Sequence, residues 1–149
     1  MTSELRELAT PEDWEAMHRI RLQVLFTEAR HPDLVYDRAH PHDTDPAHAK
    51  FLLVRGGEPI GTTRLDPRGD GGIVRLVAIV PRLQRQGHGS TLETMLADYA
   101  TARGMRRLWV NSAPDAVGFY ERRGWIRKVW DEAELAGVAQ GCVQMTRPL

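Results

Sequence analysis

Residues 73–90 read IVRLVAIVPRLQRQGHGS and carry the strongest structural signal in the chain. The nearly unbroken apolar run 73–80 is typical of a central strand that is covered on both faces. Pro81 ends that strand, and a glycine-rich segment follows it. After Gly89, apolar residues recur at helical spacing as far as Gly104, a residue type that commonly follows a helix C-terminus. The stretch therefore predicts a strand, a tight turn and an amphipathic helix.

The turn within this stretch has the features of an anion site. Gly87 and Gly89 let a ligand approach the backbone closely, and the N–H groups that open the next helix favour a pyrophosphate. A plain strand-to-helix turn with solvated arginines is the alternative. The P-loop is excluded by the missing Gly-Lys-Ser/Thr ending, and the Rossmann fingerprint by the missing third glycine. The surrounding arginines are Arg82, Arg85, Arg103, Arg106 and Arg107.

The remaining chain predicts a mixed sheet. A strand at 3–8 precedes a helix that starts with Thr10 as N-cap and carries an inward stripe through Arg21 to Glu28. Residues 31–48 are too rich in proline and polar groups for more than one helical turn. Further elements are a hairpin of strands at 51–54 and 60–65, a turn at 66–72, a strand at 108–110, a helix at 114–123, and strands at 125–130 and 142–146. A meander combined with one βαβ crossover predicts a fold of the α/β class. Its sheet should be mixed, with parallel and antiparallel strands as in α+β proteins.

Length and composition limit the class of protein. The 149 residues suit one domain, 1–149, and 42% hydrophobic with 27% charged residues is ordinary globular composition. No segment approaches the roughly 18 apolar residues of a membrane span, and the first residues lack the order of a signal peptide. The single cysteine, Cys142, excludes an internal disulfide and fits a reducing compartment. We therefore expect a cytoplasmic protein without a membrane partner.

The charge distribution argues against nucleic acid as a partner. Twenty basic and twenty acidic residues give zero net charge, so the chain lacks the field that non-specific nucleic-acid binders use. Residues 1–45 carry ten acids and five arginines, and the excess is basic after that point. The acidic part would suit a cationic acceptor.

Two motifs together resemble the GNAT superfamily of acyl-coenzyme A N-acyltransferases. The first is the strand ending VAIVP at 77–81, followed by Gln84-x-x-Gly87-x-Gly89, and the second is AVGFYERRGW at 116–125. The similarity covers residues 73–125 closely and the whole chain by the order of its elements. It implies a single GNAT-like domain, with a central mixed, mostly antiparallel sheet of six to seven strands flanked by about four helices.

A finer similarity points to a bacterial subgroup, the ElaA-like proteins. It rests on the segment from Arg21 to Glu28, the acidic loop before His48, and the strand 61–65.

The resemblance implies acetyl-CoA as the cosubstrate and predicts where it binds. In this family the turn amides hold the coenzyme A pyrophosphate, and the preceding strand pairs with the pantetheine arm and can stabilise an oxyanion. No metal is implied. The predicted cofactor-binding residues are Val77, Ala78, Ile79, Gln84, Arg85, Gln86, Gly87, His88, Gly89 and Ser90.

Tyr120 is predicted to be catalytic. It matches the family tyrosine that donates a proton to the departing thiolate. The alternative for this residue is packing of the short helix on the sheet, which is the role expected of Phe119 and Trp125.

The general base is not evident from the sequence. Many relatives carry a glutamate at the end of the strand 108–110, where this chain has Asn111, and an asparagine at the position of Ala113. Asparagine does not accept a proton at neutral pH. Glu28 is the first candidate, and a water chain or an exposed-loop role for all candidates is the alternative. The other candidates are Asp43, Asp45 and His48.

A histidine-rich loop raises a metal hypothesis that the pattern does not favour. His40, His42 and His48 lie near acids, but the loop is broken by prolines and lacks a His-Glu-x-x-His spacing. We expect no metal site.

The sequence predicts an N-acetyltransferase that moves an acetyl group from acetyl-CoA to a primary amine by direct attack in a ternary complex. The acceptor would be a small molecule or a peptide, and two chains could pair as a homodimer. A non-catalytic module that binds or senses acyl-CoA is the alternative, and a general phosphate-ligand binder is a third reading.

Overall fold

The strand predicted at residues 73–80 is the middle strand of a seven-stranded mixed sheet, and the predicted turn and helix follow it in the chain. The structure is a computed structural model that describes all 149 residues. Its strand order is β1-β2-β3-β4-β5-β7-β6, with β4 and β5 parallel. The strands are β1 (Ser3–Glu7), β2 (Ala49–Arg55), β3 (Glu58–Arg68), β4 (Gly71–Ile79), β5 (Arg107–Ser112), β6 (Ile126–Arg127) and β7 (Val143–Pro148). The predicted mixed α/β fold is confirmed.

Five α-helices and two 3-10 turns accompany the sheet. They are α1 (Pro11–Val24), α2 (Pro41–Thr44), η1 (Pro81–Leu83), α3 (His88–Ala102), η2 (Pro114–Ala116), α4 (Val117–Arg122) and α5 (Glu132–Ala136). None of these helices has the length and apolar character that crossing a membrane requires. The chain divides into two compact units, unit 1 with Met1–Asp66 and Leu76–Leu96, and unit 2 with Pro67–Arg75 and Ala97–Leu149.

Helix α1 of unit 1 begins where its N-terminal signal predicted. The Thr10 hydroxyl accepts the Asp13 N–H at 3.2 Å, and the Asp13 carboxylate accepts the Thr10 N–H at 3.3 Å. This reciprocal capping box satisfies two backbone donors that a bare helix start would leave unpaired. The helix ends at Val24 rather than continuing to Glu28, because two successive N–H groups donate to the Arg21 carbonyl and close its last turn.

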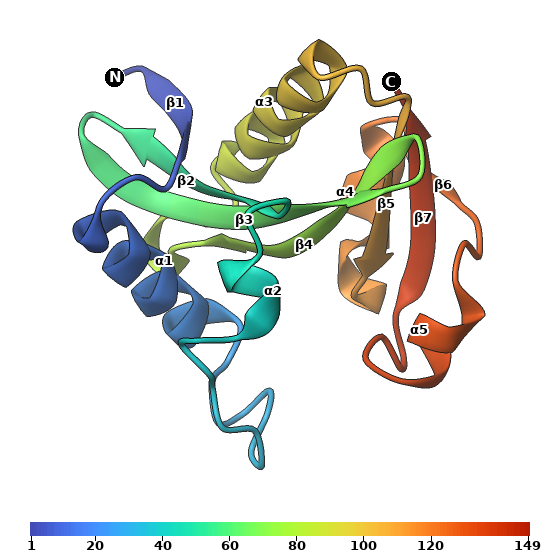
Figure 1. Cartoon of the computed structure of the whole chain (residues 1–149), viewed down its shortest axis with the longest axis horizontal. Coiled ribbons are helices and arrows are strands. Elements are labelled where there is room, and N and C mark those ends of the chain that lie inside the picture. Colours follow the sequence, from blue (N-terminus) through green and yellow to red (C-terminus); the bar gives the residue numbers. More distant parts are fainter. The chain divides into compact units, whose positions relative to one another are not determined.

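The core of unit 1 lies between α1, α3 and the first three strands. β1 and β2 pair antiparallel with Leu5 opposite Leu53, and β2 and β3 pair antiparallel with Phe51 opposite Thr63. Figure 1 shows α1 and the first part of α3 on opposite sides of β2 and β3. Burying apolar side chains on both faces makes this the main stabilising layer of the unit. The buried cluster contains Ala16, Met17, Ile20, Leu52, Leu53, Val54, Ile60, Ala78, Ile79, Val80 and Leu92.

Unit 2 is built around β5. β5 pairs in parallel with the first part of β4 and antiparallel with β7, and β7 also pairs with β6. Gly71 is required at the start of β4, because a Cβ there would lie 2.1 Å from the Arg107 carbonyl oxygen. One prediction for this region was wrong in extent. Only Ile126–Arg127 of the predicted strand 125–130 is extended, since Trp130 turns into α5, a helix that the sequence did not reveal.

Candidate functional site

The turn between η1 and α3 adopts a backbone suited to an exposed concave surface. Arg85 and Gly87 have φ values of +63° and +87°. The Gln84 side-chain amide donates to the Ile79 carbonyl at 2.9 Å, and the Gln86 amide donates to the Arg82 carbonyl at 3.2 Å. These contacts tie the turn to the end of β4 and fix the path of its backbone.

The backbone donors of this turn face solvent. Residues 84–87 are exposed, and no protein acceptor receives the N–H groups of Arg85, Gln86 and Gly87. The first N–H groups of α3 have no acceptor within the helix. Among them, the Thr91 N–H donates to the carbonyl of Gly87, which precedes the helix, at 3.1 Å. A Cβ on Gly87 would meet nothing within 4 Å. The turn can therefore accept an anion on consecutive N–H groups at the positive end of a helix.

The second half of β4 differs from the first. Register with β5 ends at Val74, and Leu76 has a φ of +55°, a conformation that costs a non-glycine residue about 1–3 kcal/mol. The residues predicted to bind the pantetheine arm, Val77–Ile79, follow this break on the same strand. A Cβ on Gly61 of β3 would lie 2.9 Å from the Ala78 carbonyl oxygen, so a side chain there would push β3 away from this segment. The chain thus delivers the predicted strand and turn residues as one continuous segment.

Tyr120 lies on α4 among aromatic side chains. Its ring meets Trp125 edge-on at 5.1 Å and Phe119 at 5.2 Å, and the residue is 7% exposed. Trp125 is 2% exposed, as expected for a core position. The packing interpretation and the catalytic one are compatible, because a packed ring can still present its hydroxyl.

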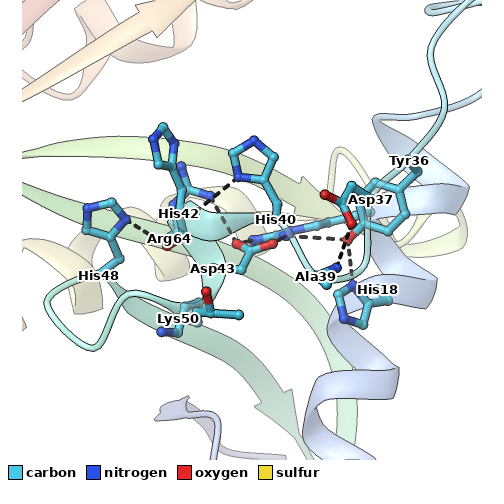
Figure 2. Close-up of polar contacts among 12 residues, drawn as sticks. His18, Tyr36, Asp37, Ala39, His40, His42, Asp43, His48, Lys50 and Arg64 are labelled. Carbon is cyan, nitrogen blue, oxygen red and sulfur yellow. Dashed lines mark hydrogen bonds and ion pairs between the residues drawn. The ribbon is translucent and has the colours of Figure 1, made fainter.

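Of the four candidate bases, Asp43 has a structural role. It is 1% exposed and receives both Arg21 Nη atoms at 2.7 and 3.0 Å and the Arg64 guanidinium at 3.0 Å. Burial alone would raise the pKa of Asp43, but the hydrogen bonds and charges of the two arginines outweigh it and hold the pKa below its ordinary value. Arg64 also binds Asp66 at 2.7 and 3.0 Å, and Figure 2 shows Asp43 beside Arg64. We call Arg21, Asp43, Arg64 and Asp66 the buried ionic cluster.

The other candidate bases are more exposed. Glu28 lies in the turns after α1, with an exposed side chain. The Asp45 carboxylate accepts the Ala47 N–H at 2.9 Å, and His48 Nδ1 lies 2.7 Å from the His42 carbonyl. Glu28 stays a prediction.

The loop after α1 is attached by its aromatic residue. Tyr36 Oη lies 2.6 Å from Nδ1 of His18, which is 5% exposed (Figure 2). Burial lowers the pKa of His18, and the nearby charges of Arg21 and Arg38 lower it further. A neutral His18 therefore anchors this loop to α1.

Unit 2 contains a second polar cluster that the sequence did not reveal. Glu134 on α5 accepts from Arg75 at 2.6 and 3.0 Å and from the Asn111 side-chain amide at 2.9 Å. Asn111 accepts in turn from the Gln144 side chain at 3.0 Å. We call Arg75, Asn111, Glu134 and Gln144 the strand-end cluster. The only hint of this cluster in the sequence was Asn111, where many relatives carry a glutamate. Nothing in the sequence marked Glu134 as its partner.

The histidines do not assemble a metal centre. The His42 ring meets the rings of His40 and His48 edge-on, with centroids 4.9 and 5.5 Å apart. The structure contains no group of three or more His, Cys, Asp or Glu side chains arranged to hold a metal ion.

Comparisons with known proteins agree with the architecture. The profile of the Acetyltransferase (GNAT) family matches residues 14–125. A provisionally assigned N-acetyltransferase from Lactobacillus plantarum is 25% identical, with a TM-score of 0.79 over 100% of this chain and 99% of that one. The PaiA N-acetyltransferase of Thermoplasma acidophilum, solved in complex with coenzyme A, is 14% identical, with a TM-score of 0.76 over 100% of both chains.

Escherichia coli ElaA is also similar in structure. It is 16% identical, with a TM-score of 0.75 over 98% of this chain and 99% of that one, a likeness that concerns the fold alone. A comparison with curated proteins finds no match.

Proposed function

We propose that this chain, which belongs to the acetyltransferase (GNAT) family, transfers an acetyl group from acetyl-CoA to a primary amine by direct attack in a ternary complex. Acyl-CoA acetyltransferase activity in general follows from the family. The observation that carries the finer proposal is the turn before α3, where positive φ values at Arg85 and Gly87 accompany exposed backbone N–H groups of Arg85, Gln86 and Gly87 that no protein acceptor receives. Such a turn suits the pyrophosphate of coenzyme A.

The proposed cofactor site uses the predicted residues in two groups. The N–H groups from Gln84 to Ser90 would bind the pyrophosphate, and the backbone of Val77–Ile79 would pair with the pantetheine arm. A backbone N–H of that segment would stabilise the oxyanion that forms when the amine attacks the thioester carbon. Tyr120 would give its hydroxyl proton to the departing thiolate and regain a proton from solvent.

The setting of the reaction completes the proposal. We treat residues 1–149 as one N-acetyltransferase domain that acts in the cytoplasm on an amine of a small molecule or a peptide, without a metal. Pairing of two chains as a homodimer is part of the same proposal and is tested by sedimentation.

A non-catalytic acyl-CoA sensor is the second candidate. Asn111 at the end of β5 favours it, because an asparagine does not serve as a general base at neutral pH. Ala113 favours it as well, since it removes a side chain that contacts the coenzyme in relatives.

Isothermal titration with acetyl-CoA, free coenzyme A and ADP tests the cofactor site. We expect binding of both coenzyme A forms, with loss of binding in Gly87→Asp, whose carboxylate repels the pyrophosphate. Gly87→Ala is the matched control, because a Cβ there meets nothing within 4 Å and adds only backbone strain at φ +87°. A folded wild type that binds no coenzyme A contradicts both the transferase and the sensor. Binding of ADP alone would indicate a general phosphate-ligand protein.

Tyr120→Phe separates the enzyme from the sensor. An enzyme loses turnover by about 100-fold, the typical contribution of a positioned acid, and keeps its affinity for coenzyme A. The measurement is release of free thiol with a panel of primary amines. Unchanged turnover in the variant would remove Tyr120 from the mechanism.

A further inference from the structure

The chain has two side-chain amines, and they lie in different surroundings. Lys50 and Lys128 are its only lysines. Lys128 follows β6 and is exposed, whereas Lys50, the second residue of β2, is half-buried within unit 1. Surroundings decide how readily a lysine amine gives up its proton and acts as a nucleophile. The two lysines therefore differ in the property on which chemical modification depends.

Three neighbours from different elements surround the Lys50 amine. Its Nζ donates to the Asp45 carbonyl, just after α2, at 3.2 Å. The same Nζ lies 5.5 Å from the centre of the Trp14 ring of α1. In the ladder of β2 with β3, Lys50 is opposite Arg64, so the two cationic side chains share one face of the sheet. An amine that is partly desolvated and close to another cation is the arrangement that activates lysine nucleophiles.

The charged groups around Lys50 act on its protonation in opposite directions. Partial burial is the largest influence, and it lowers the pKa of Lys50. The positive charge of Arg64 lowers the pKa as well. The carboxylates that raise it are Asp43, Asp45 and Glu7. Two arginines already bind Asp43, which weakens its effect on the ammonium group. The net pKa of Lys50 lies below the ordinary value of a lysine, so a larger fraction of its amine is neutral at a given pH.

The hydrogen bond of Lys50 leaves its lone pair free for attack. A neutral lysine amine keeps two N–H donors and gains one lone pair, and one N–H is enough for the bond to the Asp45 carbonyl. Because a carbonyl oxygen accepts N–H groups and not lone pairs, the lone pair of Lys50 points away from that oxygen. The contact thus holds the amine in place without using the electron pair that a nucleophile needs.

We propose that Lys50 is a modification site of this protein, and that its amine takes an acetyl group directly from acetyl-CoA in solution. The reaction uses no residue of the proposed transferase site, so the inference goes beyond the proposed function and does not depend on it. The acetylated side chain has lost its charge and two of its three N–H donors, and with them the cation–π contact with Trp14.

The reaction balances without a catalyst. The lone pair of the neutral Lys50 amine forms the N–C bond to the thioester carbon. The C–S bond breaks with its electron pair on sulfur, the nitrogen loses one proton to water, and the thiolate takes one proton from water. The products are Nε-acetyllysine at position 50 and free coenzyme A.

Site-resolved mass spectrometry of the full chain tests the proposal, with Lys128 as the internal reference. The folded protein is incubated with acetyl-CoA at about pH 8, where both amines are mostly protonated. No acceptor amine is added, and the digest uses a protease that cleaves after acidic residues. We expect the initial rate of acetylation at Lys50 to be at least about threefold that at Lys128, because the rate follows the neutral fraction of the amine. In concentrated urea the two lysines should react at similar rates, since unfolding removes the surroundings of Lys50.

Asp45→Asn is a variant that changes only the charge beside Lys50. The backbone carbonyl that binds Lys50 remains, and the Asn side-chain oxygen can still accept the Ala47 N–H. We expect acetylation at Lys50 to rise about twofold, the effect of removing one exposed opposite charge, while Lys128 is unchanged. Glu132→Gln is the matched control, because it removes an exposed carboxylate from unit 2 and should leave the rate at Lys50 unchanged.

Several results would overturn the proposal. They are acetylation of Lys50 at or below the rate of Lys128, a rate ratio that persists in urea, and an unchanged Lys50 rate in Asp45→Asn. The acetyl thioester of N-acetylcysteamine, which lacks the nucleotide of coenzyme A, should give the same preference for Lys50. A preference seen only with acetyl-CoA would mean that a bound coenzyme directs the reaction, and direct attack from solution would be wrong. None of these results bears on turnover of added amines, which tests the transferase function separately.

Discussion

The buried ionic cluster of unit 1 and the strand-end cluster of unit 2 use the same contact in different surroundings. In each, an arginine donates two hydrogen bonds of 2.6–3.0 Å to the two oxygens of a carboxylate. The Arg21 and Asp43 side chains are 1% and 2% exposed, whereas Arg75 and Glu134 are 22% and 15% exposed. The first ion pair is therefore shielded from solvent, and the second is partly open to it.

The two clusters also differ in how many hydrogen bonds their central carboxylate already accepts. Asp43 is enclosed by two guanidinium groups and joins α2 to α1 and β3. Arg21 even leaves its Nε buried without an acceptor. Glu134 is held by one arginine and one neutral amide and retains an open position on Oε2. Asp43 is thus bound on both oxygens by buried arginines, whereas Glu134 is held by one arginine and one amide near the surface.

The strongest test of the structural assignment is Asp43→Asn. It leaves Arg21 buried without a counter-charge, so we expect a loss of about 3–5 kcal/mol in the free energy of unfolding. Urea unfolding followed by circular dichroism measures it, and Asp45→Asn, an exposed acid of the same segment, is the control. A loss as small as that of the control would mean that the cluster does not stabilise unit 1.

The difference in unfolding free energy between wild type and Asp43→Asn should depend on pH. The pKa of Asp43 is lower in the folded than in the unfolded chain, so its contribution is present above about pH 4 and declines as the pH falls through the folded pKa. We expect the stability gap between wild type and Asp43→Asn to be constant from pH 5 to 8 and to narrow below about pH 4. A gap that widens on acidification would assign the effect to another group.

Gln144→Leu tests how much the hydrogen bonds of the strand-end cluster contribute to stability. Gln144 is 3% exposed, and its removal leaves the N–H groups of Trp130 and Asp131 unpaired. We expect a loss of about 1 kcal/mol in the free energy of unfolding, because two partly buried N–H groups lose their acceptor. Gln140→Leu, at an exposed position, is the control, and equal stability of the two variants would contradict the hydrogen-bond chain.

Much of the fold followed from local signals in the sequence. Pro81, Gly87 and Gly104 mark the ends of the strand, turn and helix where the structure has them, and Thr10 predicted the start of α1. These signals act within a few residues, so they can be interpreted without knowledge of the tertiary structure. The ends of elements were less predictable, since the end of α1 at Val24 depends on the turns that follow.

The two clusters show why the polar contacts were harder to predict. The helical spacing predicts the inward position of Arg21, but for Asp43, 22 residues away, the sequence predicts only a loop acid and a candidate base. Glu134 lies on a five-residue helix, too short for any periodic signal, and reaches Asn111 across 23 residues. Such pairs depend on how distant segments pack, which composition and spacing do not encode.

The smallest expected effect concerns a third arginine–carboxylate pair, between Arg38 and Glu15. Its hydrogen bonds of 2.6 and 3.2 Å match those of the buried cluster, yet its side chains are 51% and 61% exposed. Because water screens exposed charges and ordering two long side chains costs entropy, we expect Arg38→Ala to unfold with the same urea midpoint as wild type. Arg19→Ala removes an exposed arginine of α1 as a charge-matched control. A shift in Arg38→Ala as large as that of Asp43→Asn would mean that bond geometry, rather than burial, decides what an arginine–carboxylate pair contributes in this protein.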